Sequence, residues 1–124
     1  MLDQETTPAG CRVLIVEDEW LLAIDLQAAL KSLGADVIAH VGDFNDAYVQ
    51  LLRGGFDVGI IDINLRGHKA FGLADELQRQ RIPFGFSTGY SAEIIPARFA
   101  GVTRWEKPYD PRKLARYVSQ LHQT

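Results

Sequence analysis

Short, continuously apolar runs alternate with helical patterns along most of the chain. The apolar runs are rich in β-branched residues and predict strands, whereas the stretches between them carry leucine and alanine at helical spacing. The predicted strands cover residues 13–16, 36–41, 58–61, 84–87 and 102–106. Right-handed crossovers place helices on both faces of a sheet built this way. We therefore predict an α/β fold with a doubly wound, five-stranded parallel sheet.

Capping residues and glycines mark the ends of the predicted helices. Gly34 follows the first helical pattern, Asp43 would cap the second helix, and Pro111 opens the last one. Residues 62–70 are predicted to form a loop between a strand and a helix. Pro96 disfavours a helix in the weakly patterned stretch that precedes the fifth strand.

With 124 residues the chain has room for one domain, which we place at residues 11–124 behind a flexible N-terminal lead-in, residues 1–10. Its net charge of −3 argues against direct nucleic-acid binding, and no room remains for a separate DNA-binding module. The single cysteine, Cys11, has no partner for an internal disulfide, and no apolar run is long enough to span a membrane. We therefore expect a cytoplasmic protein that contacts neither membrane nor nucleic acid.

Charged and hydroxyl side chains follow four of the predicted strands. Glu17 and Asp18 follow the first strand, Asp62 the third, Thr88 the fourth and Lys107 the fifth. Because ligands of open α/β sheets bind at the carboxyl ends of the strands, these side chains should meet at one edge. Grouped carboxylates suit a hard cation such as Mg²⁺.

Several charged residues after these strands also have an ordinary structural explanation, and an aspartate such as Asp62 commonly begins a loop. Asp18 would cap the following helix, Glu19 would favour the helix dipole, and Lys107 would be a surface lysine. The combination is more specific, because it supplies metal ligands, a carboxylate nucleophile, a hydroxyl group and an ammonium group. It predicts transfer of a phosphoryl group onto Asp62, with the metal, Thr88 and Lys107 stabilising the transferred oxygens.

Four segments resemble the receiver domain of two-component response regulators: residues 13–19, 60–65, 87–89 and 106–108. That family has a flavodoxin-like, five-stranded doubly wound sheet with strand order 2-1-3-4-5, in agreement with the pattern above. The resemblance implies that a sensor histidine kinase or a histidine phosphotransfer protein donates the phosphoryl group.

The resemblance also implies a role for each residue at the strand ends. Asp62 would be the phosphoacceptor, Thr88 would hydrogen-bond the phosphoryl group, and Lys107 would pair with it. The oxygen ligands of a Mg²⁺ ion would come from four residues, namely Glu17, Asp18, Asp62 and Asn64, the last through its backbone carbonyl.

Two positions depart from the usual receiver pattern. Arg66 stands where receivers usually carry proline, and Arg104 stands where they usually carry an aromatic switch residue, with Trp105 on the opposite face of the strand. Residues 86–90 resemble a less common subgroup with a Phe-Ala-Thr-Gly pattern, which often stands alone. We expect phosphorylation to order the segment from Tyr90 to Gly101, which would bind a downstream protein partner, although some of its apolar side chains must pack in the core.

Two alternatives stay open. One is a receiver excised from a larger hybrid kinase or output-domain regulator, although the ending at Gln123 and Thr124 shows no linker-like extension. The other is a Mg²⁺-dependent phosphohydrolase, which would carry a second carboxylate two residues after its nucleophile, where this chain has Asn64. We expect a signalling protein that takes part only in its own phosphorylation and dephosphorylation, not a dedicated enzyme.

Overall fold

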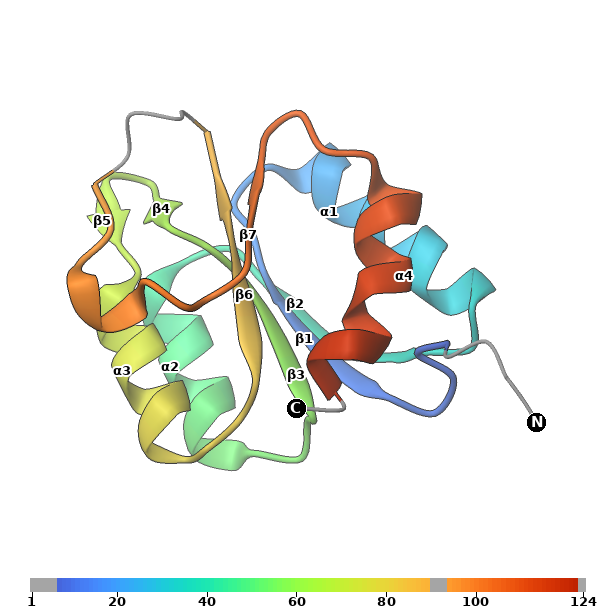
Figure 1. Cartoon of the computed structure of the whole chain (residues 1–124), viewed down its shortest axis with the longest axis horizontal. Helices are drawn as coiled ribbons and strands as arrows, with labels where there is room; N and C mark the ends of the chain where they lie inside the picture. The colour runs from blue at the N-terminus through green and yellow to red at the C-terminus, as the bar shows by residue number, and fades with distance from the viewer. Residues whose placement is uncertain (1–6, 90–93, 123–124) are drawn as a thin grey trace.

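The computed structural model describes residues 7–89 and 94–122, and its main feature is a five-stranded parallel sheet (Figure 1). The strands are β1 (Arg12–Val16), β2 (Asp36–Val41), β3 (Val58–Asp62), β6 (Phe84–Thr88) and β7 (Arg104–Glu106). They lie in the order β2-β1-β3-β6-β7, and every neighbouring pair is parallel. The predicted strand order 2-1-3-4-5 is confirmed, because β6 and β7 are the fourth and fifth strands of this sheet.

Helices cover both faces of the sheet. They are α1 (Trp20–Ser32), α2 (Phe44–Arg53), α3 (Phe71–Arg79) and α4 (Pro111–His122). Helices α1 and α4 pack on one face, and α2 and α3 pack on the other (Figure 1). Val13 and Ile15 of β1 enter the core beneath α1 and α4, whereas Leu14 and Val16 enter the core beneath α2 and α3. Burial on both faces explains why the apolar runs of the central strands β1, β3 and β6 are continuous in sequence.

Local signals in the sequence set the ends of these helices. The carboxylate of Asp43 accepts a hydrogen bond from the backbone N–H of Asp46 (2.8 Å) and caps α2. Asp110 accepts one from the backbone N–H of Arg112 (2.9 Å) at the start of α4. Gly34 follows α1 with a φ of 87°, a left-handed conformation that glycine adopts without strain. The predicted helix ends at these positions are confirmed.

The connection after β3 differs from the predicted loop. It contains a small antiparallel hairpin made of β4 (Asn64–Leu65) and β5 (His68–Lys69). The turn residues Arg66 and Gly67 both have positive φ, 50° and 87°, as a type I′ turn requires. Such turns favour asparagine, aspartate or glycine at their first central position, so Arg66 gave the sequence only a weak hairpin signal.

Trp105 confirms the predicted alternation along β7. Arg104 is exposed, whereas the partly buried Trp105 ring packs against the core beneath α1 and α4, with its centroid 5.8 Å from that of Tyr117. A Cβ atom added at Gly85 on the neighbouring strand β6 would lie 2.5 Å from the Trp105 ring. Glycine at this position therefore makes room for the indole.

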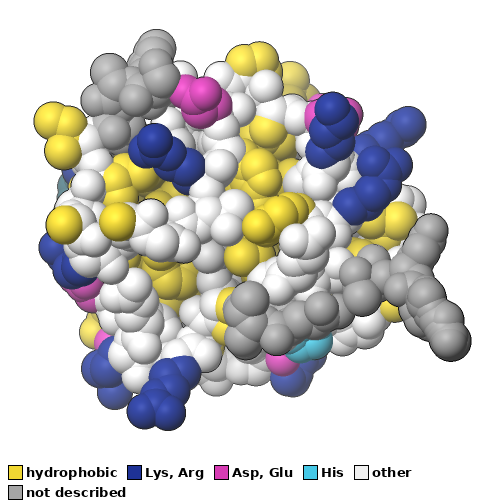
Figure 2. Space-filling view, in the orientation of Figure 1, with side chains coloured by type: hydrophobic (Ala, Val, Ile, Leu, Met, Phe, Trp, Pro, Cys, Tyr) yellow, Lys and Arg dark blue, Asp and Glu magenta, His cyan; other side chains and the backbone are white. Residues whose placement is uncertain are grey.

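The surface seen in the orientation of Figure 1 is mixed in character. Hydrophobic side chains gather in the middle of this face, and most Lys and Arg side chains lie toward its margin (Figure 2). Within residues 7–89 and 94–122, no helix combines the length and apolar character needed to cross a membrane.

Candidate functional site

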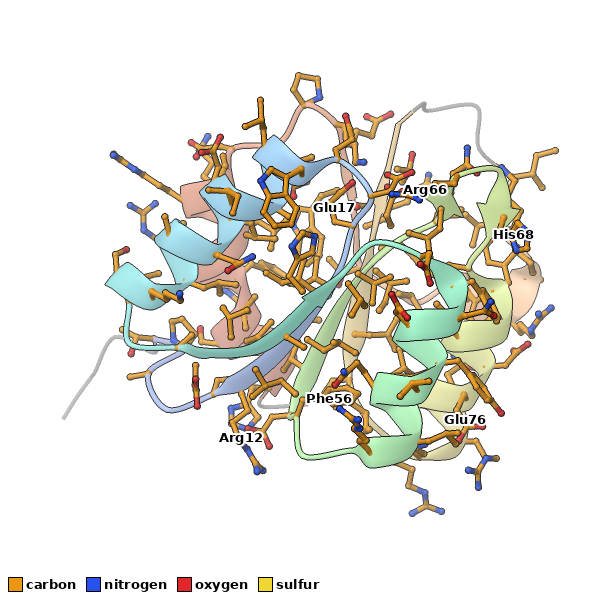
Figure 3. The ribbon with its side chains drawn as sticks, turned by 180° about the vertical axis from the view of Figure 1, so that it is seen from behind. Arg12, Glu17, Phe56, Arg66, His68 and Glu76 are labelled. Carbon is orange, nitrogen blue, oxygen red and sulfur yellow. The ribbon has the colours of Figure 1, made fainter. Side chains whose placement is uncertain are left out.

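The predicted site residues converge at the carboxyl edge of the parallel sheet. Glu17 and Asp18 follow β1, Asp62 ends β3, and Lys107 follows β7. Asp18, Asp62 and Lys107 line an open pocket of about 590 Å³, and Glu17 is buried beside it. Figure 3 shows Glu17 at this edge, near the hairpin that carries Arg66.

The ammonium group of Lys107 binds three carboxylates. Its Nζ lies 2.9 Å from Oδ2 of Asp62, 3.0 Å from Oε2 of Glu17 and 2.7 Å from Oε2 of Glu19. The side chains of Glu17 and Asp62 are only 3% and 4% exposed, whereas that of Glu19 is 58% exposed. An ammonium group has three N–H donors, so these contacts use its full hydrogen-bonding capacity.

Three carboxylates at this edge form a set that fits a divalent cation. One oxygen from each of Glu17, Asp18 and Asp62 lies within 4.8 Å of the others. Oε1 of Glu17 is buried and has no hydrogen-bond partner among the described residues. A buried oxygen of this kind is normally satisfied by a donor or a ligand. Oxygen donors so arranged match the preference of Mg²⁺ for carboxylates and water.

Crowding and burial change the protonation of these groups. Burial, followed by the charge of Asp62, raises the pKa of Glu17 from 4.5 to about 7. Burial also raises the pKa of Asp62, although hydrogen bonding to Lys107 opposes that rise. Burial alone would lower the pKa of Lys107, but its three carboxylate partners outweigh that effect and raise it. Lys107 therefore stays charged, and Glu17 titrates near neutral pH.

The hairpin after β3 holds two of the carboxylates through its backbone. The backbone N–H of Asn64 donates to Oδ1 of Asp62 (3.1 Å), and that of Arg66 donates to Oδ2 of Asp18 (3.0 Å). Asn64 also lines the pocket. The side chain of Arg66 is exposed, so this residue orients Asp18 through its main chain.

Thr88 lies at the end of β6 and is buried. Its carbonyl oxygen accepts a hydrogen bond from the backbone N–H of Lys107 (2.8 Å), which joins the ends of β6 and β7. The next residue, Gly89, lines the pocket. The fold therefore brings Thr88 to the same edge as Asp62 and Lys107.

Two residues at this edge were missed by the sequence reasoning. Glu19 contacts Lys107 directly, although the sequence predicts no site role for it beyond its place in the run of three acids that begins at Glu17. Tyr109 lies close enough that the charge of Glu17 adds to burial in raising its pKa. No sequence pattern marks Tyr109, because its approach depends on the turn after β7.

The predicted partner segment is described only in part, because Tyr90 lies outside the described residues. Ile94 is 85% exposed, whereas Ile95 is partly buried against the core beneath α2 and α3. Phe99 is fully buried and ends a short 3₁₀ turn, η1 (Ala97–Phe99). Ile95 and Phe99 therefore pack in or against the core, which leaves Ile94 as the exposed large apolar side chain within residues 94–101.

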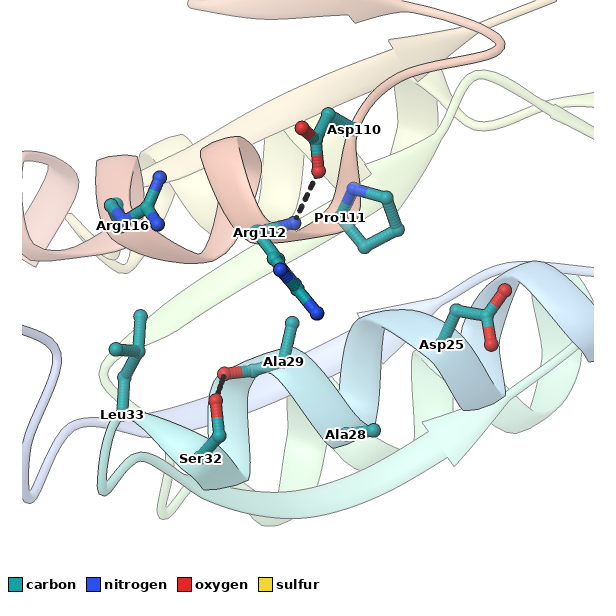
Figure 4. A pocket seen from close by; sticks show the side chains of 9 residues that line it. All are labelled: Asp25, Ala28, Ala29, Ser32, Leu33, Asp110, Pro111, Arg112 and Arg116. Carbon is teal, nitrogen blue, oxygen red and sulfur yellow. Dashed lines mark hydrogen bonds between the residues drawn. The ribbon is translucent and has the colours of Figure 1, made fainter.

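A second cavity, of about 460 Å³, lies between α1 and α4 (Figure 4). Asp25 and Ala29 line it from α1, and Arg112 and Arg116 line it from α4. None of the predicted site residues lines this cavity, so the candidate site remains the pocket at the strand ends.

No family model and no curated protein matches the chain, but solved structures do. SdrG from Sphingomonas melonis Fr1 is 34% identical with a TM-score of 0.79, and the match covers 90% of this chain and 96% of SdrG. The BeF3-activated conformation of SdrG from Pseudomonas melonis Fr1 is 34% identical with a TM-score of 0.75, covering 91% and 98%. The receiver (REC) domain of the PhyR response regulator from Erythrobacter litoralis is 23% identical with a TM-score of 0.73, covering 91% and 90%, and supports the fold alone.

The chain belongs to the response regulator receiver domain family. The strand order, the acidic cluster at the sheet edge and the 34% sequence identity to SdrG together support this assignment. Receiver domains are not dedicated enzymes, and they generally bind Mg²⁺ in an acidic pocket. In this chain Glu17, Asp18 and Asp62 form the acidic cluster at the corresponding edge of the sheet.

Proposed function

We propose that this receiver accepts a phosphoryl group on Asp62 from a sensor histidine kinase or a histidine phosphotransfer protein. The observation that carries the proposal is the 2.9 Å contact between Nζ of Lys107 and Oδ2 of Asp62 at an open pocket. A carboxylate at a strand end can act as the nucleophile, and the ammonium group beside it meets the charge that arrives with the phosphoryl group.

In the proposed reaction, a carboxylate oxygen of Asp62 attacks the phosphorus atom of a phosphohistidine. The bond from phosphorus to the imidazole nitrogen breaks, and the imidazole leaves with the electron pair. The product is an acyl phosphate on Asp62. Lys107 and the hydroxyl group of Thr88 donate hydrogen bonds to the phosphoryl oxygens, where charge is spread in the transition state.

The residues that would hold Mg²⁺ are Glu17, Asp18 and Asp62, with the backbone carbonyl of Asn64. An ion bound there would neutralise negative charge on the transferring phosphoryl group. The spacing of the three carboxylates within 4.8 Å and the unpartnered Oε1 of Glu17 support this assignment.

Incubation with acetyl phosphate and Mg²⁺, followed by intact-mass measurement, tests the proposal. We expect the wild-type chain to gain one phosphoryl group and Asp62→Asn to gain none. Asp25→Asn removes an exposed carboxylate of α1 outside the pocket and should be labelled like the wild type. An adduct of the same size on Asp62→Asn would contradict the assignment of the phosphoacceptor.

We further propose that the signal leaves through a protein partner at the face from Tyr90 to Gly101. Receivers usually carry an aromatic switch residue where this chain has Arg104, and the ring of the next residue, Trp105, packs toward α4. In this proposal, ordering of the segment therefore takes the place of the movement of an aromatic side chain. SdrG adopts a BeF3-activated conformation, which makes beryllofluoride a suitable phosphoryl mimic for this chain. We expect it to slow amide hydrogen exchange in residues 94–101; unchanged protection there would contradict the proposal.

The receiver would occupy residues 11–124 and act in the cytoplasm. The resemblance of residues 86–90 to the Phe-Ala-Thr-Gly subgroup supports action as a separate chain. The same chemistry at Asp62 would serve a receiver within a larger hybrid kinase or regulator.

A further inference from the structure

Glu19 differs from the other two carboxylates that bind Lys107. Its contact is the shortest of the three, at 2.7 Å, yet its side chain is 58% exposed while those of Glu17 and Asp62 are buried. Glu19 therefore holds the ammonium group from the solvent side of the pocket, which it also lines.

The position of Glu19 in the chain makes this contact notable. Glu19 is the N-cap residue of α1, a position at which a side chain normally accepts a hydrogen bond from the first turn of the helix. Its side chain makes no such capping bond and reaches Lys107 instead. Its backbone is fixed, because its N–H donates to Oε2 of Glu17 (2.9 Å). The carboxylate of Glu19 is thus anchored at the rim and directed toward Lys107.

We propose that Glu19 is a positioning residue that binds the ammonium group of Lys107 in the unphosphorylated state. This contact slows the step in which Lys107 redirects one of its N–H donors to an incoming phosphoryl group. This inference rests on the proposed function of Asp62. The three N–H donors of Lys107 are all engaged by carboxylates, so a phosphoryl oxygen gains a donor only when one of those contacts breaks. The contact with Glu19 breaks most easily, because its exposed carboxylate returns to water while the carboxylates of Glu17 and Asp62 are both buried.

The transfer from a small acyl phosphate can be written in full. A carboxylate oxygen of Asp62 attacks phosphorus, the bond from phosphorus to the acyl oxygen breaks, and acetate leaves with the electron pair. During this step one N–H of Lys107 moves from the carboxylate of Glu19 to a phosphoryl oxygen. Glu19 also places a negative charge at the rim, which opposes the approach of an anionic donor.

The rate of Asp62 labelling by acetyl phosphate at saturating Mg²⁺ tests the proposal. We expect Glu19→Gln to be labelled about two- to fivefold faster than the wild type, the range that exposed ion pairs support. Glu19→Asp keeps the charge but shortens the side chain by one methylene, so it should also be faster if the contact with Lys107 matters. The charge-matched control Asp25→Asn, on the same helix, should react at the wild-type rate. Equal or slower labelling of both Glu19 variants would overturn the proposal.

A second measurement separates failure of this proposal from failure of the proposed function. Trace acetylation with acetic anhydride, read by peptide mass, reports the reactivity of Lys107 relative to the exposed Lys31. We expect Glu19→Gln and Glu19→Asp to raise the relative reactivity of Lys107 and Asp25→Asn to leave it unchanged. Unchanged reactivity in all three variants would overturn the positioning role of Glu19. Absence of a phosphoryl adduct on every variant, with the change in Lys107 reactivity present, would overturn the function of Asp62 alone.

Discussion

Replacing Glu17 by glutamine should stabilise the domain at alkaline pH in the absence of divalent cations. Burial and the charge of Asp62 raise the pKa of Glu17 from 4.5 to about 7, so ionisation of this residue is harder in the folded state than in the unfolded state. A raised carboxyl pKa gives stability that is fully present below pH 4.5 and is lost as the pH rises toward 7. The glutamine variant keeps the shape and an oxygen for Lys107 but has no proton to lose.

The size of the effect follows from the pKa shift. Each unit of difference between the folded and unfolded pKa values corresponds to about 1.4 kcal/mol. Ionisation of Glu17 therefore lowers the free energy of unfolding by about 3 kcal/mol at pH 8. At pH 5 the folded state still holds the proton, and the cost is about 1 kcal/mol or less. These values already include the favourable contact with Lys107, which lowers the pKa of Glu17. The substitution Glu17→Gln should therefore raise the free energy of unfolding, relative to the wild type, by about 2 to 3 kcal/mol more at pH 8 than at pH 5.

Urea unfolding with a chelator present, followed by circular dichroism at the two pH values, measures this gain. The control is Glu76→Gln, which removes a carboxylate whose hydrogen bond to Arg79 lowers its pKa to about 2, so it should lose stability at pH 8. Added Mg²⁺ should stabilise the wild type more than Glu17→Gln and so narrow the gap. A gain of equal size at both pH values, or a loss at pH 8, would refute the reasoning about ionised Glu17.

Two further predictions concern the fold. Asp43→Ala removes the side chain that caps α2 and should lower the free energy of unfolding by about 1 kcal/mol, measured by urea unfolding; an unchanged midpoint would contradict the capping role. Gly85→Ala places a Cβ atom 2.5 Å from the Trp105 ring and should cost about 1 to 3 kcal/mol, with a shift in tryptophan fluorescence. Gly101→Ala, whose added Cβ meets no atom within 4 Å, should stay within about 0.5 kcal/mol of the wild type, and equal losses in the two variants would argue against the ring contact.

The sequence was sufficient to predict the sheet, because strands buried on both faces are continuously apolar and the helices between them carry their own end signals. The sequence also predicted that Asp18, Asp62 and Lys107 meet at one edge of the sheet, because the carboxyl ends of parallel strands lie together. It did not predict the hairpin at Arg66, where the turn is imposed by the surrounding fold. Nor did it predict the bond from Glu19 to Lys107, because a contact across 88 positions depends on side-chain direction that a linear pattern does not carry.

The closeness of Gly85 and Trp105 has a consequence for how the sequence of this domain can change. The two positions share a single volume on the sheet, so a larger residue at position 85 can be accepted only together with a smaller one at position 105. A smaller residue at position 105 would in turn give up the ring contact with Tyr117 that ties β7 to α4. Substitutions at positions 85 and 105 are therefore coupled to each other and to the packing of α4. We expect them to occur in compensating pairs during evolution.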